Sequence, residues 1–234
     1  MTLLGQAAVA MWWDIAPASR AEFEDWHSHE HFPERMSIPS FLRGSRWASA
    51  QGTDGFFVLY ELAAYETLTS REYLARLNDP TPWSKKMMPL HRNMVRSQCR
   101  LVETFGGGIA RSMMTLRLSP QQGQTELLHQ YLKTQLLKLP LQPGVTGAHL
   151  LYTQTPNTGL TQEQKIRGGE DAVADWIVLV SGYEASALSK LAADQLGPDA
   201  LSGAGMASAP QYSLFDLAYT VTPTDIRAQP MRGP

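Results

Sequence analysis

Two successive runs of the same predicted elements, strand–helix–strand–strand–helix–strand, fill most of this 234-residue sequence. Alternating apolar residues predict strands, and a period near 3.6 predicts helices. The first run is predicted to have strands at 6–15, 41–50, 55–62 and 92–105, and helices at 19–36 and 70–77. The second is predicted to have strands at 110–118, 145–154, 176–183 and 211–222, and helices at 124–138 and 185–196. Aligning Pro39 with Pro143 superposes the two runs, so the sequence predicts a tandem repeat.

Each run has the βαββαβ order of a ferredoxin-like unit. Its helices cover one face of an antiparallel sheet, and the other face is apolar and must be buried. A second copy in the same chain buries it most simply. The predicted fold is therefore α+β, with two tandem ferredoxin-like units forming an intrachain dimeric α+β barrel.

The linker Gly106-Gly107-Gly108 divides the predicted units. We expect residues 1–105 to form an N-terminal unit that carries a pocket, and 109–222 to form a degenerate C-terminal repeat. The tail 223–234 is expected to be disordered or to lie across the surface. An insertion at 155–174, rich in Thr, Gly, Gln and charged residues, is predicted to be a mobile surface loop.

Composition excludes several partners and compartments. A formal net charge of -2 provides no basic surface for nucleic acid. A single cysteine excludes an internal disulfide and favours a cytoplasmic protein. We expect Cys99, in a predicted strand, to be a buried, inert thiol. The N-terminal residues lack the basic and apolar regions of a signal peptide, and no membrane segment is predicted.

Half of the six histidines lie between His27 and His31, interleaved with Glu30 and followed by Glu34. Titratable groups this close can shift one another's pKa toward the range that proton transfer at neutral pH needs. At 100° per residue, Phe23, Trp26, His27, Glu30 and Glu34 share one arc of the predicted helix. Glu30, together with His27 or Glu34, should therefore point toward the sheet. His31 falls at the edge of the arc, and His29 should be solvated.

Two other interpretations of this cluster stay open. It could be the polar flank of an amphipathic helix. It could also bind a metal, since His27 and His31 are four residues apart and Glu30 could add an oxygen ligand. The order His-x-x-Glu-His is inverted relative to the common zinc motif, and Pro33 predicts that the helix ends or kinks there. No metal is therefore predicted.

The second run lacks the cluster. When the two runs are aligned, His27, Glu30, His31 and Glu34 of the first run correspond to Tyr131, Thr134, Gln135 and Lys138 of the second. This difference favours one functional pocket, in the N-terminal unit, with the C-terminal unit as its structural mate.

Aromatic residues provide candidate pocket walls. Trp26 lies on the inner arc of the first helix, and Trp12 and Trp13 point to opposite faces of the first strand. The proline-rich stretch 77–93 is predicted to be an irregular loop that presents Trp83 over the pocket mouth, although core packing explains Trp83 as well. One of His91, Arg92 and Arg96 could contact an acidic substrate, or all three could be solvated. The predicted substrate-binding residues are Trp12, Trp26, Glu34, Trp83 and His91.

The stretch from Glu22 to Gly44, with Glu30-His31-Phe32-Pro33 followed by Pro39-Ser40-Phe41, resembles the signature of EthD-like proteins of the dimeric α+β barrel superfamily. Ser40 stands where glycine is usual in that signature. The superfamily includes cofactor-independent monooxygenases, muconolactone-type isomerases, aldoxime dehydratases and haem peroxidases. The resemblance implies that Glu30 and His31 line the pocket. Haem is disfavoured, because the axial histidine of the haem enzymes would lie in the second half, which offers only His129 and His149. No cofactor is therefore predicted.

We therefore expect a small-molecule enzyme of the EthD-like type that acts without a metal on an apolar, aromatic or lactone-like compound. Isomerase, lyase and monooxygenase chemistry all fit, with His31 or His27 moving a proton and Glu30 orienting it. The alternatives are a non-catalytic protein that binds such a ligand in a degradation pathway, and an interaction module with no cavity. The expected partner is a small molecule, and a homodimer stays open.

Overall fold

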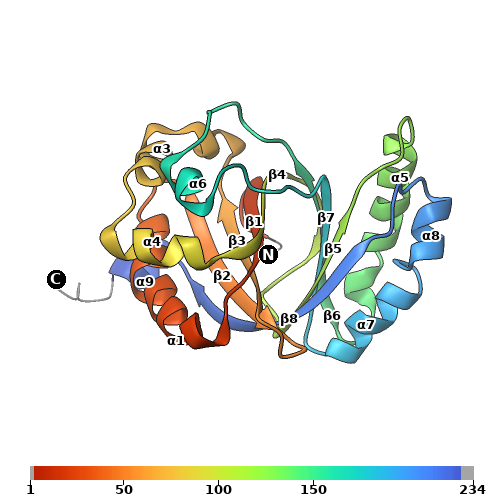
Figure 1. The fold of residues 1–234 in the computed structure, drawn as a ribbon. Helices are drawn as coiled ribbons and strands as arrows, with labels where there is room; N and C mark the ends of the chain where they lie inside the picture. The colour runs from red at the N-terminus through yellow and green to blue at the C-terminus, as the bar shows by residue number, and fades with distance from the viewer. Residues whose placement is uncertain (1–2, 228–234) are drawn as a thin grey trace.

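The computed structural model describes residues 3–227. The first half of the chain contains four strands with helices between them (Figure 1). Its elements are β1 (Ala7–Asp14), α1 (Pro17–Trp26), the π-helical turn η1 (His27–His31), α2 (Phe32–Met36), β2 (Phe41–Ser49), β3 (Gly55–Leu62), the 3₁₀ turn η2 (Tyr65–Thr69), α3 (Arg71–Asn78), α4 (Pro82–Met87), the 3₁₀ turn η3 (Met88–Leu90) and β4 (Arg92–Gly106).

The second half repeats this order with one additional helix between its second and third strands. Its elements are β5 (Ser112–Leu118), α5 (Thr125–Leu136), the 3₁₀ turn η4 (Leu139–Leu141), β6 (Val145–Thr153), α6 (Gln162–Arg167), β7 (Trp176–Gly182), α7 (Ala185–Ala193), α8 (Pro198–Gly203), β8 (Gln211–Val221) and α9 (Pro223–Arg227).

The eight strands form one closed antiparallel barrel in the order β1-β3-β2-β8-β5-β7-β6-β4. Within each half the order is that of a ferredoxin-like sheet, β4-β1-β3-β2 and β8-β5-β7-β6. Two seams join the halves, where β2 pairs with β8 and β4 pairs with β6. Closure leaves no sheet edge unpaired. The predicted dimeric α+β barrel is confirmed.

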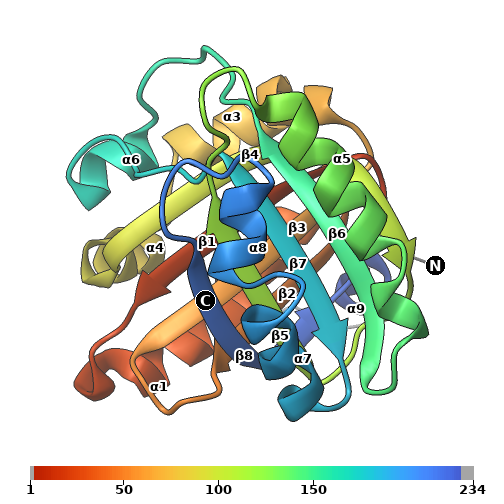
Figure 2. The ribbon, with the colours of Figure 1, turned by 90° about the vertical axis from the view of Figure 1, so that its right-hand side faces the viewer.

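Helices flank the barrel on two opposite sides, and the apolar core accordingly has three parts. Figure 2 shows α5, α7 and α8 in front of the second sheet. Strand β1 illustrates the division, because successive side chains of a strand point to opposite faces. Ala8, Ala10 and Trp12 belong to the barrel interior, whereas Val9 and Trp13 pack under the helices of the first half.

Several predictions of local structure need correction. Helix α1 begins at Pro17, two residues before the predicted start at 19, and the fixed φ of proline suits the first helical turn. The stretch 77–93 is not an irregular loop, since it contains α4. Thr81 caps the first turn of α4, because its side chain accepts a hydrogen bond from Ser84 N–H. The insertion likewise contains a helix, α6.

The start of the predicted tail is helical. Residues 223–227 form α9, and Ile226 packs against the core of the first half. The rest of the tail lies outside the described residues. Cys99 is buried, as predicted, and burial raises the pKa of its thiol to about 12. No helix within residues 3–227 is long and apolar enough to cross a membrane.

The seam between β4 and β6 provides a test of the fold. Gly106 ends β4 with a φ of +75°, and a Cβ there would lie 2.2 Å from the Thr146 carbonyl oxygen. Gly108 has a similar φ of +79° but open space around it. We predict that Gly106→Ala lowers the free energy of unfolding by about 1–3 kcal/mol more than Gly108→Ala, measured by urea denaturation. Equal losses in the two variants would contradict the close approach of β4 to β6 at this seam.

Candidate active site

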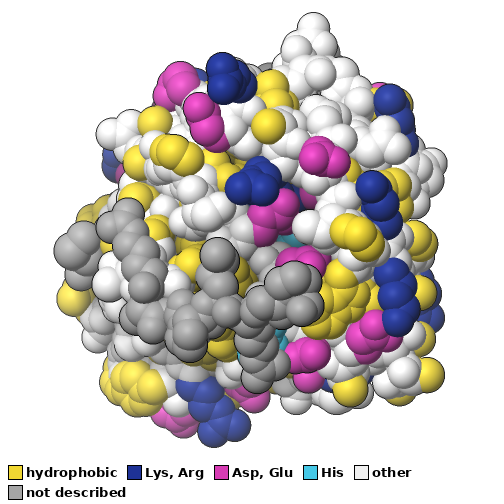
Figure 3. Space-filling view, turned by 90° about the vertical axis from the view of Figure 1, so that its left-hand side faces the viewer, with side chains coloured by type: hydrophobic (Ala, Val, Ile, Leu, Met, Phe, Trp, Pro, Cys, Tyr) yellow, Lys and Arg dark blue, Asp and Glu magenta, His cyan; other side chains and the backbone are white. Residues whose placement is uncertain are grey.

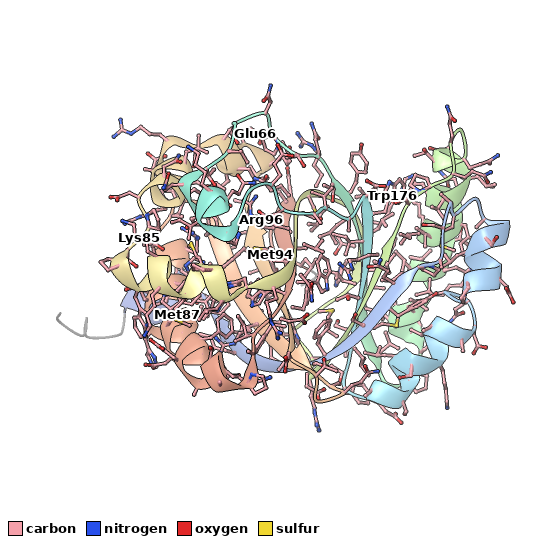
Figure 4. The ribbon with its side chains drawn as sticks, viewed as in Figure 1. Glu66, Lys85, Met87, Met94, Arg96 and Trp176 are labelled. Atoms are coloured by element: carbon pink, nitrogen blue, oxygen red, sulfur yellow. The ribbon has the colours of Figure 1, made fainter. Side chains whose placement is uncertain are left out.

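A cavity of about 40 Å³ lies between the first sheet and the helices that cover it. Its floor is the outer face of β1 and β4, including Met11, Trp13 and Met94. Figure 4 shows Met94 and Arg96 of β4 beneath α6. The polar side chains around it come from both halves of the chain: His27, His31, Arg35, Tyr60, Tyr73, His91, Arg96, Glu163 and Arg167.

The histidines are held by a π-helical turn between α1 and α2. The Phe32 N–H bonds to the carbonyl of His27, five residues back, in place of the usual four. Pro33 follows at the start of α2 and lacks an N–H of its own. Such a turn amounts to one extra residue within a helix, and π turns of this kind are frequent at functional sites.

The extra residue shifts every later side chain by one position. His31 takes the inward direction that ideal helical geometry predicts for Glu30, and Arg35 takes the one predicted for Glu34. Both are buried, with 8% and 3% of their surface exposed, and both line the cavity. His29 is exposed and bonds to Asp25, as expected from the helical arc.

The predicted pairing of Glu30 with His31 is wrong. The Glu30 carboxylate instead accepts hydrogen bonds from Trp26 Nε1 at 3.1 Å, Thr81 Oγ1 at 2.5 Å and Ser84 Oγ at 3.3 Å. It therefore fastens α1 to α4 and holds the Trp26 indole. The carboxylate near His31 belongs to Glu34, with 3.7 Å between Nδ1 and Oε2.

His27 and His31 are set among aromatic rings. The His31 ring lies 4.7 Å from that of Trp26 and 5.3 Å from that of His27, and Phe32 meets His27 edge-on at 4.3 Å. Gly44 makes room for Phe32, because a Cβ there would lie 2.6 Å from its ring. Burial lowers the pKa of both imidazoles well below the ordinary value, and neighbouring guanidinium groups lower it further. Both are neutral at pH 7.

His91 completes the group from the end of η3. Its Nδ1 lies 3.2 and 3.1 Å from the carbonyls of Met87 and Met88, and a carbonyl only accepts, so Nδ1 carries the proton. The ring lies 4.9 Å from that of Trp13. Burial lowers the pKa of His91 to about 4. The predicted binding residue thus lines the cavity as a neutral imidazole.

The insertion of the second half closes this cavity in the first. Helix α6 packs beside α3 and the η3 turn (Figure 1) and places Glu163 and Arg167 in the cavity lining. Thr161 and Gln164 cap its start reciprocally, and Gln162 N–H bonds to Asn78 Oδ1 at 3.1 Å. Further along, Arg96 N–H bonds to the Ala172 carbonyl at 2.8 Å. The insertion therefore covers the cavity and is held in place by these hydrogen bonds.

A buried ion pair joins the cover to the histidine-bearing helix. The Arg35 guanidinium bonds to Glu163, and 3% and 6% of the two side chains is exposed. Burial lowers the pKa of Arg35, but the charges of Glu163 and Glu34 outweigh it, so the net shift is upward. Glu163 also lies 3.8 Å from Arg167, which forms a bidentate pair with Asp171.

Buried polar atoms without a hydrogen-bond partner gather around this cavity. Of the eight such buried side-chain atoms among the described residues, five belong to cavity-lining residues. They are Trp13 Nε1, His27 Nδ1, His31 Nδ1, Arg35 Nη1 and Tyr60 Oη. Buried polar groups are normally hydrogen-bonded, and groups that are not so paired call for an explanation. Here they form a set of donors and acceptors around one small space.

Two predicted binding residues lie elsewhere. Trp12 points into the barrel, and its neighbour Trp13 lines the cavity in its place. Trp83 is part of α4 and packs against the core of the first half. Trp26 lines the cavity, whereas Glu34 lies beside it.

Arg96, one of the residues that the sequence offers as a contact for an acidic substrate, lines the cavity, whereas Arg35, Glu163 and Arg167 were not predicted as site residues. The Thr161-Gln162-Glu163-Gln164 pattern is a capping box, which would have predicted a helix in the insertion. On the face that α1, α3 and α4 cover, Figure 3 shows small areas of histidine beside acidic side chains.

Neither metal nor haem fits the residues found. Among residues 3–227, no three His, Cys, Asp or Glu side chains are grouped so as to hold a metal ion. The second-half histidines are engaged, with His149 Nδ1 2.7 Å from Thr104 Oγ1 and His129 Nε2 3.1 Å from Glu103.

No protein-family model matches the chain, and no curated protein sequence matches it. Solved structures show the fold. An anthrone oxidase-like protein is 13% identical, with a TM-score of 0.63 and 93% of each chain covered. A proposed monooxygenase from Fusobacterium nucleatum is 6% identical, with a TM-score of 0.59 and 94% and 95% of the chains covered. Another from Lactobacillus acidophilus is 7% identical, with a TM-score of 0.59 and coverage of 94% and 97%. The chain therefore has the dimeric α+β barrel fold of monooxygenase-like proteins.

The ion pair gives a stability prediction. Glu163→Gln leaves the buried Arg35 guanidinium without its carboxylate, and we expect a loss of about 3–5 kcal/mol in the free energy of unfolding. The control is Glu170→Gln, an exposed residue of the same insertion, which should change stability by less than about 0.5 kcal/mol. Urea denaturation measures both. Losses of similar size would contradict a cover fastened by this ion pair.

The neutral histidines give a pH prediction. Because the folded-state pKa values of His27, His31 and His91 are lowered, the unfolded chain binds more protons than the folded protein below about pH 6.5. Stability should be fully present at pH 7 and fall as the pH decreases, by up to about 1.4 kcal/mol per pH unit for each histidine. The free energy of unfolding should depend less steeply on pH in His31→Gln than in the wild type. The same pH dependence in both proteins would be contrary to buried, neutral histidines.

Proposed function

We propose that this protein is a small-molecule enzyme that removes a proton from an apolar, aromatic or lactone-like compound at the histidine cavity. Its main support is the set of buried polar atoms around this cavity that have no hydrogen-bond partner, two of which are imidazole nitrogens. A neutral imidazole in a protected site is a ready general base. His31 is the proposed base. His27, whose ring centre lies 5.3 Å from that of His31, supports it.

The neighbours of His31 suit the charges that such a step creates. Proton transfer makes an imidazolium, and the Glu34 carboxylate 3.7 Å away would stabilise it. The substrate becomes an enolate or phenolate, whose oxygen would accept hydrogen bonds from Arg35 Nη1 and Tyr60 Oη. Fixed donors placed where negative charge develops are a major source of catalysis.

Substrate entry requires movement of the cover, because about 40 Å³ holds only a few waters. A groove of about 500 Å³ lies under the insertion and shares Leu77 and Arg96 with the cavity. Displacement of α6 would join the two spaces. The joined space is of the size that small-molecule sites usually have.

Oxygenation is the reaction that we favour. An acidic methylene gives up one proton to His31, and the carbanion adds O₂ to form a peroxide anion. The proton returns from His31 to give a hydroperoxide, which loses water and leaves a ketone. The substrate thereby gains one oxygen atom and loses two hydrogens, and O₂ is the oxidant. The monooxygenase-like and anthrone oxidase-like names of the fold relatives support this choice.

A lactone isomerase would use the same base without O₂. A non-catalytic protein would hold the ligand in the same cavity without turnover, and the closed cover with its buried ion pair is the feature that fits such storage. An enzyme and a storage protein differ in whether a substrate proton exchanges with solvent.

Anthrone, a tricyclic ketone with an acidic methylene, is a suitable probe. We predict protein-catalysed deuterium exchange at its methylene without oxygen, and oxygen uptake in air. His31→Gln should lower both rates by about 100-fold or more. His29→Gln removes an exposed histidine of the same turn and should leave both rates unchanged. Exchange at the wild-type rate in a folded His31→Gln variant would exclude His31 as the base.

A further inference from the structure

We infer that the mouth of the barrel is a second binding site, for a planar organic carboxylate held by Arg117 against Trp12. It is separate from the histidine cavity and does not depend on the proposed function. Trp12 itself is a predicted binding residue that the cavity does not use.

The stacked pair is well positioned. Arg117, on β5, places its guanidinium carbon 4.9 Å from the centre of the Trp12 ring. The Trp12 indole is fixed by a hydrogen bond of 3.2 Å to Thr115 Oγ1 and by stacking on Phe57 at 4.9 Å. A guanidinium that stacks on a rigid ring keeps its donors directed to the side, where a carboxylate can accept two of them.

Arg117 has no counter-charge within the described part of the chain. Its Nε is buried without a hydrogen-bond partner, and no ion pair within residues 3–227 involves it. The carboxylates that line the same hollows have other partners: Asp14 accepts from Asn93, and Asp175 accepts from Ser119. Burial lowers the pKa of Arg117, and no neighbouring charge opposes that effect. A partly buried cation of this kind is stabilised when an anion binds it.

Arg117 also lies between two hollows that could hold a ligand. One has a volume of about 350 Å³ and the other about 230 Å³, and both are lined by Arg117, Val95 and Gln211. The larger adds the apolar side chains of Trp12 and Phe215. The chemistry therefore fits a carboxylate on an aromatic body, with the carboxylate on Arg117 and the ring beside Trp12 and Val95.

Trp13 separates this site from the histidine cavity, since its side chain lines both spaces. Arg35 and Arg96 could also bind an organic anion, so a test must distinguish them from Arg117. The experiment uses the full chain with benzoate as the probe and benzamide, a neutral molecule of the same shape, as its comparison.

Binding is measured by NMR chemical-shift titration, following the indole N–H signals. We expect millimolar benzoate to shift the Trp12 signal and benzamide to leave it unchanged. Arg117→Gln should weaken benzoate binding by about tenfold or more, because two charge-assisted hydrogen bonds are lost. Arg117→Lys should retain only part of the wild-type affinity for benzoate, since lysine offers a point charge in place of the planar, two-donor guanidinium.

Two controls complete the design. Arg111→Gln removes an exposed arginine at the other end of β5, and Arg96→Gln removes one from the histidine cavity. Both should leave the Trp12 response to benzoate unchanged. The inference is overturned if benzoate fails to shift the Trp12 signal, if benzamide shifts it equally, or if a folded Arg117→Gln variant binds benzoate as the wild type does.

Discussion

The backbone hydrogen bond from Phe32 N–H to the His27 carbonyl closes a π-helical turn, and the composition of the candidate site depends on it. Without the extra residue, Glu30 and Glu34 would face the sheet, and the cavity would be lined by carboxylates. With it, His31 and Arg35 face inward, and Glu30 becomes the residue that holds Trp26 and α4. One turn of backbone thus converts an acidic site into one with neutral bases and a fixed cation.

The second constraint is the buried ion pair between Arg35 and Glu163, which ties the two halves of the chain together at this site. The second half provides more than the other side of the barrel, because its insertion supplies the cover and a carboxylate. A buried ion pair recovers its desolvation cost only when geometry and further hydrogen bonds are favourable. Arg35 is also near Glu34, and Glu163 near Arg167, so the charges of the cover are balanced within a small cluster.

The fold could be predicted well from the sequence, because strand alternation and helix periodicity are repeated in both halves and reinforce each other. The prediction of which site residues face inward was only partly right. An assumed spacing of 100° per residue cannot anticipate a π turn, so Glu30 was expected where His31 lies. Polar composition likewise led to a loop at 155–174, although Thr161 and Gln164 carry the signature of a helix start. Ser40 has a left-handed φ of 73°, a conformation that glycine adopts without strain.

Histidine NMR measures whether His27, His31 and His91 are neutral bases in the enclosed cavity. The experiment is a pH titration of the imidazole signals in the full chain, which has six histidines. We expect His27, His31 and His91 to remain neutral well below pH 6.5, and the His91 ring to carry its proton on Nδ1. Protonation of these three imidazoles near pH 6.5, the ordinary histidine pKa, would contradict buried, neutral bases.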